Sequence, residues 1–536
     1  MQESEFDWTE GERGSFSWLD YVVFGGMLVL SLAIGIFYAF RSRKKSNDEF
    51  LLGSRSLSCF PVSMSLLASY ISAIIVLGGP AEAYYHSVQW WVVCLSQVAL
   101  PVVAGVFMPV FYELRLTSIY ELRYSSRAVR CVAGGMFVIQ MLLYQAVVIY
   151  APALALASVS DYPLWASVVS VGLIASFYTA IGGLKAVIWT DVLQLFILIA
   201  GLICIILKGT FDVGGFSYIW DTAVRNGRAG SQIFTYGYHP TQRHTVANIV
   251  IGAFVSKLYG YACAQTAVQR YSSMKSLTHA HLSIYLLIPF YTLIVSLTMI
   301  AGLVMFATYE GCDPLAAGLI TKKDQILPFY VMDRLSSIPG LPGLFVACIF
   351  SGSLSTISSG VNSQAAVTWE DVFSRRPGCA SLSKTTQAWI TKFFALGYGI
   401  LAPVWPWGSP GRHPSRNHRH HLPFFGLGPI ILDMNPELLP TSTDLCPANL
   451  TLPTTSGTPI SVSELPYPQK LLGLSYTQIA PLGFVVAFAV GIFTSFITGG
   501  SKGLQVERRL VHPWVRWSLP DPNKISAKSR LIPMTN

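Results

Sequence analysis

Eleven segments of this chain are each long and apolar enough to cross a lipid bilayer as a helix. A spanning helix needs about 20 apolar residues. Only 12% of the 536 residues are charged, whereas a soluble domain typically carries about 25%. The segments are 18–41, 57–80, 89–111, 130–157, 163–182, 187–207, 246–268, 281–306, 341–367, 387–404 and 475–497. The sequence therefore predicts an all-α integral membrane protein with about 11 transmembrane helices in a lipid bilayer.

Lysine and arginine residues gather in alternate loops, which predicts the direction of each helix. They follow the first segment (RSRKK, 41–45) and separate the third from the fourth, the seventh from the eighth and the ninth from the tenth. The acidic N-terminus lacks the basic start of a cleavable signal peptide, so the first segment is expected to be retained. We expect a multi-pass plasma-membrane protein with residues 1–17 extracellular and 498–536 as a cytoplasmic tail.

The expected extracellular loops carry two features that fit this topology. Asn449-Leu450-Thr451 is a sequon for N-glycosylation. Cys312 and Cys446 both fall outside, where a disulfide can persist. None of the nine cysteines forms a CxxC pair, so a structural zinc site is not expected. Glycosylation at Asn449 and a Cys312–Cys446 bridge are therefore predictions of the topology.

Two broad function classes are disfavoured by the sequence. The net charge is +9, but the basic residues are scattered and form no basic face with interleaved aromatic residues, so nucleic-acid binding is not expected. The apolar segments hold no paired catalytic acids, and the chain has no HExxH motif and no phosphate-binding loop, so we do not expect an enzyme. Transport of a solute through the membrane is the favoured class.

Small polar residues interrupt two apolar segments, at 57–80 and at 350–363, where FSGSLSTISSGVNS has seven Ser or Thr residues in fourteen. Discontinuous helices indicate a transporter binding site, although the same residue types also let helices pack closely. Gly352, Ser355 and Thr356 share one helix face, and neutral oxygens suit a hard cation. The carbonyls of Ala68 and Ile71 complete a sodium site if the first broken helix crosses here.

Several motifs resemble the sodium/solute symporters, in the branch of the iodide, multivitamin and monocarboxylate carriers. They are LLGSRSLSCFPVSMSLLASYISAIIVLGGPAEAY (51–84), LYQAVVIYAPALAL (143–156), YTAIGGLKAVIWTDVLQLFILIAG (178–201), AVQRY (267–271) and LSTISSGVNSQAAVTWEDV (354–372). The resemblance implies a leucine-transporter-type inverted-repeat bundle, usually of 13 helices, with alternating access. It implies no cofactor, with sodium as the coupling ion.

The resemblance also implies roles for individual residues. Its sodium site, between the first and eighth core helices, maps onto Ala68, Ile71, Gly352, Ser355 and Thr356. Asp191 matches an acidic residue near the sodium exit path, with an interfacial helix cap near Lys185 as the alternative. The candidate substrate contacts are Gln97, Tyr144 and Gln265. Buried Tyr and Gln side chains, however, more often form hydrogen bonds with neighbouring backbone groups than with a ligand.

Two departures from the family pattern concern the substrate. Branch members often have YGVNQ before the VQRY motif, whereas residues 261–265 here read YACAQ, without the asparagine amide. No lysine or arginine is firmly placed in the core to pair an organic anion. Anion recognition is then expected to rely on dipoles, hydroxyls and the bound sodium.

The region after the tenth segment departs most from the family. Residues 406–425 are rich in Pro, Arg, His and Gly, and the apolar piece 423–434 is too short to span. His418, His420 and His421 could indicate a metal site, but a surface loop is favoured, since no carboxylate or cysteine is near in the sequence. Sodium is the only metal expected. The pattern lacks two late family helices, and a shifted reading frame or altered splice is one hypothesis for this region.

The predicted organisation is an extracellular N-terminus (1–17), a transporter core (18–404), a disrupted region and extracellular loop (405–474), a last transmembrane helix (475–497) and a cytoplasmic tail (498–536). The predicted function is sodium-coupled symport of a small organic anion, such as a monocarboxylate or a carboxylate-bearing vitamin. The alternative is a transport-inactive family member that acts as a sensor or interaction protein.

Overall fold

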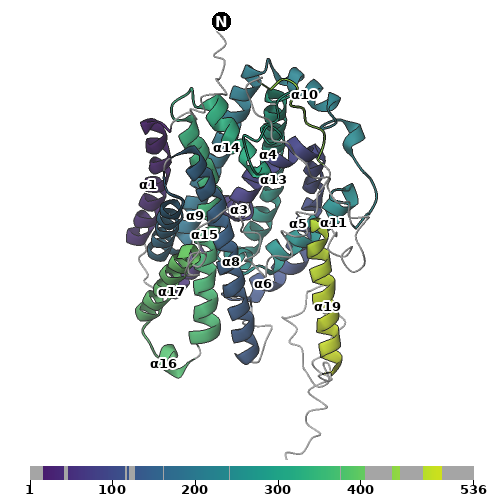
Figure 1. Cartoon of the computed structure of the whole chain (residues 1–536). Coiled ribbons are helices and arrows are strands. Elements are labelled where there is room, and N and C mark those ends of the chain that lie inside the picture. The colour runs from purple at the N-terminus through teal and green to yellow at the C-terminus, as the bar shows by residue number, and fades with distance from the viewer. Residues whose placement is uncertain are drawn as a thin grey trace, which may run out of the picture.

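The computed structural model describes residues 16–41, 46–114, 117–119, 127–160, 162–240, 242–374, 376–404, 438–446 and 475–497. Within these ranges the regular structure is helical, apart from one isolated bridge between Leu57 and Met274. The helices stand roughly side by side as a bundle (Figure 1), with α10 (Phe216–Arg225) at the end where α1 begins and α16 (Pro377–Ala380) at the opposite end. The all-helical prediction is confirmed for the described residues.

Each expected span is found as helix in the structure. The single helices are α1 (Trp18–Arg41), α8 (Arg127–Val159), α13 (Leu277–Thr308), α15 (Leu341–Val367), α17 (Lys384–Val404) and α19 (Ile479–Ile497). The segment expected at 89–111 is a helical run whose type changes along its length. It consists of the 3-10 helix η2 (Val88–Val98), α5 (Ala99–Val102), the π-helical η3 (Val103–Phe107) and α6 (Met108–Leu114). Side chains define some starts, since Ser276 caps α13 by accepting from the backbone N–H of His279.

The spans expected at 163–182 and 187–207 are the two halves of α9 (Leu164–Asp212). They meet at Gly183, whose φ of 63° and ψ of −161° break the helix. A Cβ at this position would lie 2.7 Å from the carbonyl oxygen of Phe50 on α2 (Asn47–Leu52), so only glycine fits both the backbone and the space.

Two spans are discontinuous. The axes of α3 (Cys59–Tyr70) and α4 (Ala73–His86) differ by 62°. The span expected at 246–268 consists of α11 (Val246–Leu258), a π-helical turn η5 (Tyr259–Cys263) and α12 (Gln265–Ser272), with extended backbone at Ala264. The break in 57–80 is therefore confirmed, whereas the hydroxyl-rich run at 350–363 lies within the continuous helix α15.

By length and apolarity, eight helices of the described ranges qualify as membrane spans, or nine with the bent pair α3–α4. The expected count of eleven differs for two reasons. The joined helix α9 counts once, and α17 is long enough but less apolar than the others.

Helix α15 lies at the centre of the bundle and packs against α9, α1, α8, α17 and α3. Of the most apolar stretch of residues 341–373, 94% is buried. The serine, glycine and alanine residues of α15 allow neighbouring helices to approach its backbone closely. The start of α15 is held by the buried Asp20 on α1, whose Oδ1 accepts from the backbone N–H of Gly340 (2.9 Å) and Gly343 (2.8 Å).

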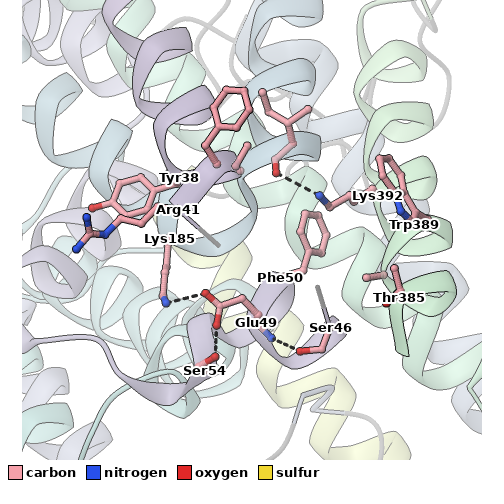
Figure 2. A pocket seen from close by; sticks show the side chains of 15 residues that line it. Tyr38, Arg41, Ser46, Glu49, Phe50, Ser54, Lys185, Thr385, Trp389 and Lys392 are labelled. Carbon is pink, nitrogen blue, oxygen red and sulfur yellow. Dashed lines mark hydrogen bonds and ion pairs between the residues drawn. The ribbon is translucent and has the colours of Figure 1, made fainter. Parts of the chain in front are cut away.

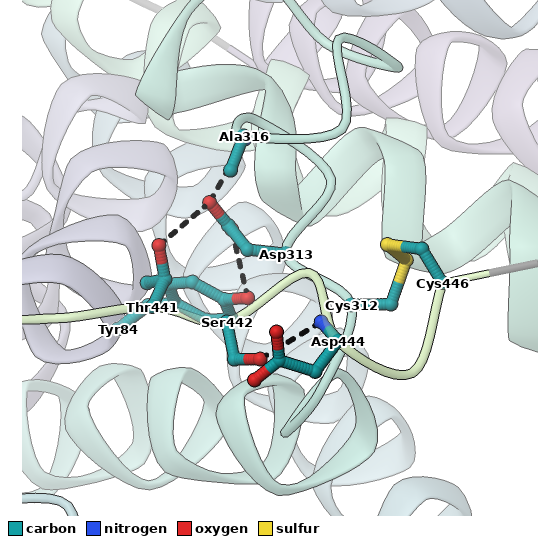
Figure 3. Close-up of a disulfide and its surroundings, with 8 residues drawn as sticks. All are labelled: Tyr84, Cys312, Asp313, Ala316, Thr441, Ser442, Asp444 and Cys446. Carbon is teal, nitrogen blue, oxygen red and sulfur yellow. Dashed lines mark hydrogen bonds between the residues drawn. A yellow bond between two sulfur atoms is a disulfide. The ribbon is translucent and has the colours of Figure 1, made fainter. Parts of the chain in front are cut away.

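A disulfide joins Cys312 to Cys446 and confirms the predicted pairing (Figure 3). Beside it, the backbone N–H of Asp313 donates to the carbonyl of Ser442 (3.0 Å), and the Asp313 side chain accepts from the Thr441 hydroxyl (3.2 Å). The disulfide and these hydrogen bonds hold segment 438–446 against the bundle. The sequon at Asn449, the disrupted piece 405–434 with its three histidines, and the tail 498–536 lie outside the described residues.

Candidate sodium and substrate site

The break between α3 and α4 is made by two residues with extended backbone, Ile71 (φ −85°, ψ 92°) and Ser72 (φ −83°, ψ 168°). The carbonyls in the last turn of a helix have no intrahelical donor. The end of α3 therefore offers backbone oxygens from residues such as Ala68 in the bundle interior, where Ala68 and Ile71 are both buried.

Helix α15 approaches this break at Gly352. A Cβ at Gly352 would lie only 2.9 Å from the backbone nitrogen of Ala73. One turn further, the Ser69 hydroxyl lies 3.5 Å from that of Ser355 and 2.7 Å from that of Ser359. The structure thus brings the first broken helix and the hydroxyl-rich run together, which is the condition that the sequence analysis set for the sodium site. Ser355 and Thr356 are 0% and 4% exposed.

The seven hydroxyls of the run divide between helix packing and this site. Those of Ser351, Ser353, Thr356 and Ser358 donate to backbone carbonyls, and that of Ser363 donates to the Gln269 side chain. Only Ser355 and Ser359 contact the Ser69 side chain on α3. Thr356 donates to the Gly352 carbonyl (3.0 Å), which leaves its oxygen lone pairs able to accept. The packing interpretation therefore holds for part of the run, whereas Ser355 and Ser359 face the break, where the ion site is predicted.

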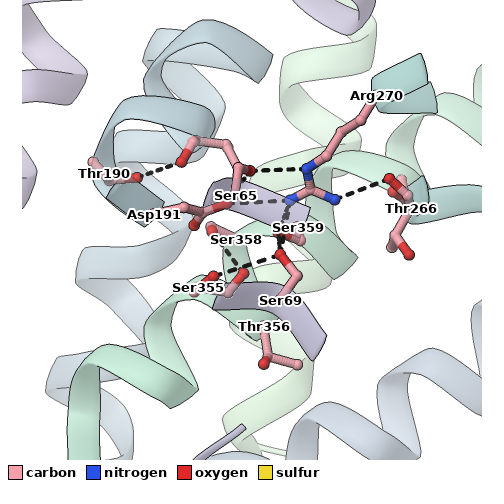
Figure 4. Close-up of polar contacts among 12 residues, drawn as sticks. Ser65, Ser69, Thr190, Asp191, Thr266, Arg270, Ser355, Thr356, Ser358 and Ser359 are labelled. Carbon is pink, nitrogen blue, oxygen red and sulfur yellow. Dashed lines mark hydrogen bonds and ion pairs between the residues drawn. The ribbon is translucent and has the colours of Figure 1, made fainter. Parts of the chain in front are cut away.

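A buried ion pair lies directly beside these hydroxyls (Figure 4). Oδ2 of Asp191 accepts from the Ser65 hydroxyl (2.5 Å) and from Nη2 of Arg270 (3.2 Å). The same Arg270 nitrogen donates to the Ser69 hydroxyl (2.8 Å) and to that of Ser359. Both charged side chains are nearly inaccessible, at 0% for Asp191 and 2% for Arg270.

The alternative placement of Asp191 as an interfacial helix cap near Lys185 is wrong, because Asp191 is fully buried and Lys185 pairs with Glu49 (2.7 Å). Among the described residues, Oδ1 of Asp191 has no hydrogen-bond partner. The sequence analysis missed Arg270, although the AVQRY motif places it only two residues after the expected span 246–268, which was a visible signal.

The three candidate substrate residues have different surroundings. Tyr144 on α8 is 40% exposed and interacts with the Ser72 side chain at the break. Gln97 is buried, and its side-chain nitrogen has no hydrogen-bond partner in the described ranges. Gln265 instead accepts from the backbone N–H of Ile119 (2.9 Å) and donates to the carbonyl of Thr117 (2.6 Å). Gln265 thus forms hydrogen bonds with the backbone of Thr117 and Ile119, which is the structural alternative to substrate contact given in the sequence analysis.

The expectation that no lysine or arginine is firmly placed in the core is wrong, since Arg270 and Lys257 are both buried there. Arg270 already pairs with Asp191, which leaves Lys257 for an organic anion. Lys257 on α11 is 1% exposed, and its Nζ donates to the Ser96 hydroxyl (2.7 Å) and the Val93 carbonyl (3.1 Å). None of the ion pairs formed among the described residues includes Lys257.

Aromatic rings connect Lys257 to the first break. Nζ lies 4.2 Å from the centre of the Tyr291 ring, and Tyr291 packs edge-on against Tyr70, the last residue of α3 (6.1 Å between centroids). Tyr70 also stacks on Tyr261 in the π-turn of the second broken span (4.9 Å). The aromatic cluster of Tyr70, Tyr261 and Tyr291 therefore joins both interrupted spans beside the buried Lys257 side chain.

Comparison with known proteins shows that this chain is similar to sodium-coupled transporters. The model of the sodium:solute symporter family matches residues 50–407. Sodium-coupled monocarboxylate transporter 1 of Mus musculus is 42% identical over 393 residues, which cover 72% of this chain and 64% of that transporter. Its Homo sapiens counterpart is 37% identical over 91% of this chain and 88% of its own length. The sodium-dependent multivitamin transporter of Oryctolagus cuniculus is 36% identical over 93% and 85%, respectively.

A solved structure is also similar. A sodium-coupled sialic acid symporter, in a substrate-bound outward-open state, has a TM-score of 0.66 and 25% sequence identity, and the match covers 74% of this chain and 84% of that chain. The leucine-transporter-type arrangement expected from the motifs agrees with this likeness.

Proposed function

The chain belongs to the sodium:solute symporter family, and on that premise we propose that it imports a small organic anion together with sodium by alternating access. The observation that carries this proposal is the contact between the break of α3–α4 and the Gly352–Ser359 stretch of α15. In a bilayer, backbone of this kind is tolerated where it lines a cavity or is buried in protein. An ion site explains why carbonyls and hydroxyls converge there.

The proposed sodium ligands are the carbonyls of Ala68, Ile71 and Gly352 and the hydroxyls of Ser355 and Thr356. All are neutral, so the ion brings its own charge to a site where the Asp191–Arg270 pair already has a net charge of zero. Oδ1 of Asp191, which lacks a partner among the described residues, fits a step on the sodium release path. Binding to the carbonyls of α3 and the hydroxyls of α15 would hold the two helices together.

For the anion, we propose Lys257 as the counter-ion of its carboxylate. A buried ammonium without a carboxylate partner is costly, and a charged residue within a membrane span indicates function. The amide nitrogen of Gln97 on η2, the helix that also carries Ser96, has no hydrogen-bond partner among the described residues and would be a second donor for the same carboxylate. Tyr144, beside Ser72, would line the path between the two sites.

The sodium site is tested by uptake of a radiolabelled short-chain monocarboxylate into cells, in sodium and in choline medium. The variant Ser355→Ala/Thr356→Ala should lose sodium-dependent uptake at normal surface expression. Ser353→Ala is the matched control, because this hydroxyl lies on the same helix but donates to the Val148 carbonyl. Full sodium-dependent uptake by the double variant would reject the proposed ligands.

The anion site is tested separately by kinetics. Lys257→Met removes the ammonium but keeps a long apolar side chain, so we expect correct folding and a rise in KM for the carboxylate of at least ten-fold. Lys257→Arg keeps the charge and should restore part of the affinity. An unchanged KM in Lys257→Met would contradict the role of the ammonium without affecting the sodium site.

A second candidate is a transport-inactive family member that acts as a sensor or interaction protein. It is favoured by the end of the family match at residue 407, where the divergent region 405–434 begins. Equal uptake in sodium and choline by this chain, with uptake recovered when two family helices replace 405–434, would support it. Sodium-dependent uptake by the unaltered chain would exclude it.

We also propose that the disulfide end of the bundle is extracellular, that Asn449 is glycosylated and that the protein resides in the plasma membrane. The Cys312–Cys446 bridge supports this orientation, because disulfides persist in oxidising compartments. A mobility shift after glycosidase treatment, absent in Asn449→Gln, would test the glycosylation and the orientation, and surface labelling would test the location in the plasma membrane.

A further inference from the structure

A polar cavity of about 780 Å³ lies away from the proposed transport site, where four elements meet (Figure 2). Its walls are the end of α1, helix α2, the kink of α9 around Gly182 and the first turns of α17. The basic segment 41–45 begins at its rim, with Arg41. By the positive-inside rule this end of α1 faces the cytoplasm.

The charges that line the cavity have a net value of +2. Glu49 is matched by Lys185 (2.7 Å) and also accepts from the Ser54 hydroxyl, so both of its oxygens are engaged. Two further cations, Arg41 and Lys392, complete the lining: three positive charges less one negative charge leave two. Figure 2 shows Arg41 and Lys185 on one side of the cavity and Lys392 on the other. An anion in the cavity would therefore meet positive charge on both sides.

Aromatic side chains give the cavity an apolar rim. Phe40 is 88% exposed and Trp389 is 62% exposed, although both belong to helices of the bundle. Nζ of Lys392 lies 5.2 Å from the Trp389 ring and 5.6 Å from the Phe50 ring, and it donates to the carbonyl of Ile181 (3.3 Å). Exposed tryptophan beside basic residues is typical of the level of the lipid headgroups.

We propose that this cavity binds the headgroup of an anionic glycerophospholipid, with the phosphate between Arg41 and Lys392 and the acyl chains along Phe40 and Trp389. Basic pockets between transmembrane helices on the cytoplasmic side are suited to such headgroups. A free anion would use the cations but not the exposed aromatic rim. Because the lipid would touch α1 and α17 together, its binding should stabilise the packing of these two helices at the cavity.

The test uses the full-length purified chain in detergent, with phosphatidylserine or phosphatidylcholine added in equal amounts. Native mass spectrometry counts the retained lipids, and thermal unfolding reports stability. The variant Arg41→Gln/Lys392→Gln removes both cations, and Arg41→Lys/Lys392→Arg keeps their charge. The matched control is Lys275→Gln/Arg376→Gln, which removes two exposed cations from the same predicted side of the membrane, outside the cavity.

We expect the parent and the control to retain at least three-fold more phosphatidylserine than the Gln/Gln cavity variant, with preference over phosphatidylcholine, and the charge-keeping variant to follow the parent. Equal loss in the cavity and control variants would overturn the proposal, as would equal retention of both lipids by the parent. Inorganic phosphate that stabilises the parent as much as phosphatidylserine would mean a free-anion site and also overturn it. Thermal unfolding in phosphatidylcholine identifies a variant that fails to fold. If the Gln/Gln variant does not fold, the proposal is tested by whether Arg41→Lys/Lys392→Arg retains phosphatidylserine as the parent does.

Discussion

At the scale of single residues, the proposed sodium site depends on how closely two backbones approach each other. Gly352 faces the backbone of Ser72 and Ala73, and these are atoms that no change of side-chain rotamer can move. The hydroxyls of Ser355 and Ser359 reach Ser69 only because this contact is so close. Residue size at position 352 therefore controls the ligand geometry as directly as the hydroxyls do.

Gly352→Ala should separate α15 from the break. The added Cβ would lie 2.9 Å from the Ala73 nitrogen, and such overpacking costs about 1–3 kcal/mol. We expect a lower thermal midpoint in detergent and weaker apparent sodium affinity in uptake assays. Gly135→Ala on α8 is the control, because nothing lies within 4 Å of its Cβ position. Unchanged sodium affinity in Gly352→Ala would contradict the contact.

The buried pair of Asp191 and Arg270 should be strongly coupled. Removing one partner of a buried ion pair leaves an uncompensated charge and costs about 3–5 kcal/mol. Arg270→Gln and Asp191→Asn should each lower the thermal midpoint markedly, whereas the double variant should be more stable than either. A double-mutant cycle measures this coupling. Additive losses would mean that the two charges do not depend on each other.

At the scale of elements, the proposed sodium site, the aromatic cluster and the proposed lipid cavity all lie at interruptions of helices. The α3–α4 break exposes carbonyls to α15, the α11–α12 break places Tyr261 against Tyr70, and the kink of α9 borders the proposed lipid cavity. Each interruption is local backbone geometry that neighbouring helices maintain.

Gly183→Ala tests the kink of α9. The φ of 63° with ψ of −161° is a conformation essentially restricted to glycine, and strain of this kind costs about 1–3 kcal/mol. The added Cβ would also meet the Phe50 carbonyl oxygen at 2.7 Å. We expect reduced thermal stability and poor surface expression. Gly397→Ala on α17, with nothing within 4 Å of the Cβ position, should express like the parent.

At the scale of the whole molecule, the end that carries the disulfide is held by polar contacts between distant segments. Arg243 pairs with Glu82 (2.7 Å), and the buried His244 shares a hydrogen bond with the Tyr476 hydroxyl (2.7 Å) just before α19. Helix α19 otherwise contacts mainly α11 and is exposed over most of its surface. The attachment of the last helix therefore depends partly on His244.

Stability of this end should fall in mild acid. Burial lowers the pKa of His244 from 6.5 to about 4, although the neighbouring Glu82 opposes the shift. Between these two values the unfolded chain binds a proton that the folded chain does not, so the histidine disfavours folding progressively as pH falls from about 6.5 to about 4. The thermal midpoint should drop over this range, and less so in His244→Gln. An equal drop in both proteins would assign the effect to other groups.

Local pattern was sufficient for much of the architecture. Every expected span is helical, because an apolar run of about 20 residues has few other stable forms in a bilayer. Polar and helix-breaking residues in 57–80 predicted the broken helix. The break depends on neighbours in the sequence, so the sequence reveals it, whereas the contact between Ser69 and Ser359 joins residues 290 positions apart and needed the fold.

The pairings across the bundle were decided only by the tertiary structure. Arg270 meets Asp191 across 79 positions of sequence, and Gln265 turns toward the 117–119 backbone rather than toward a ligand. Lys257 was visible as a charge in an apolar segment, but its burial without a carboxylate partner in the described ranges depends on how η2 and α13 pack around it. Composition and periodicity determine which segments enter the membrane, whereas the partner of a buried charge depends on which helices the fold brings within a few ångströms of it.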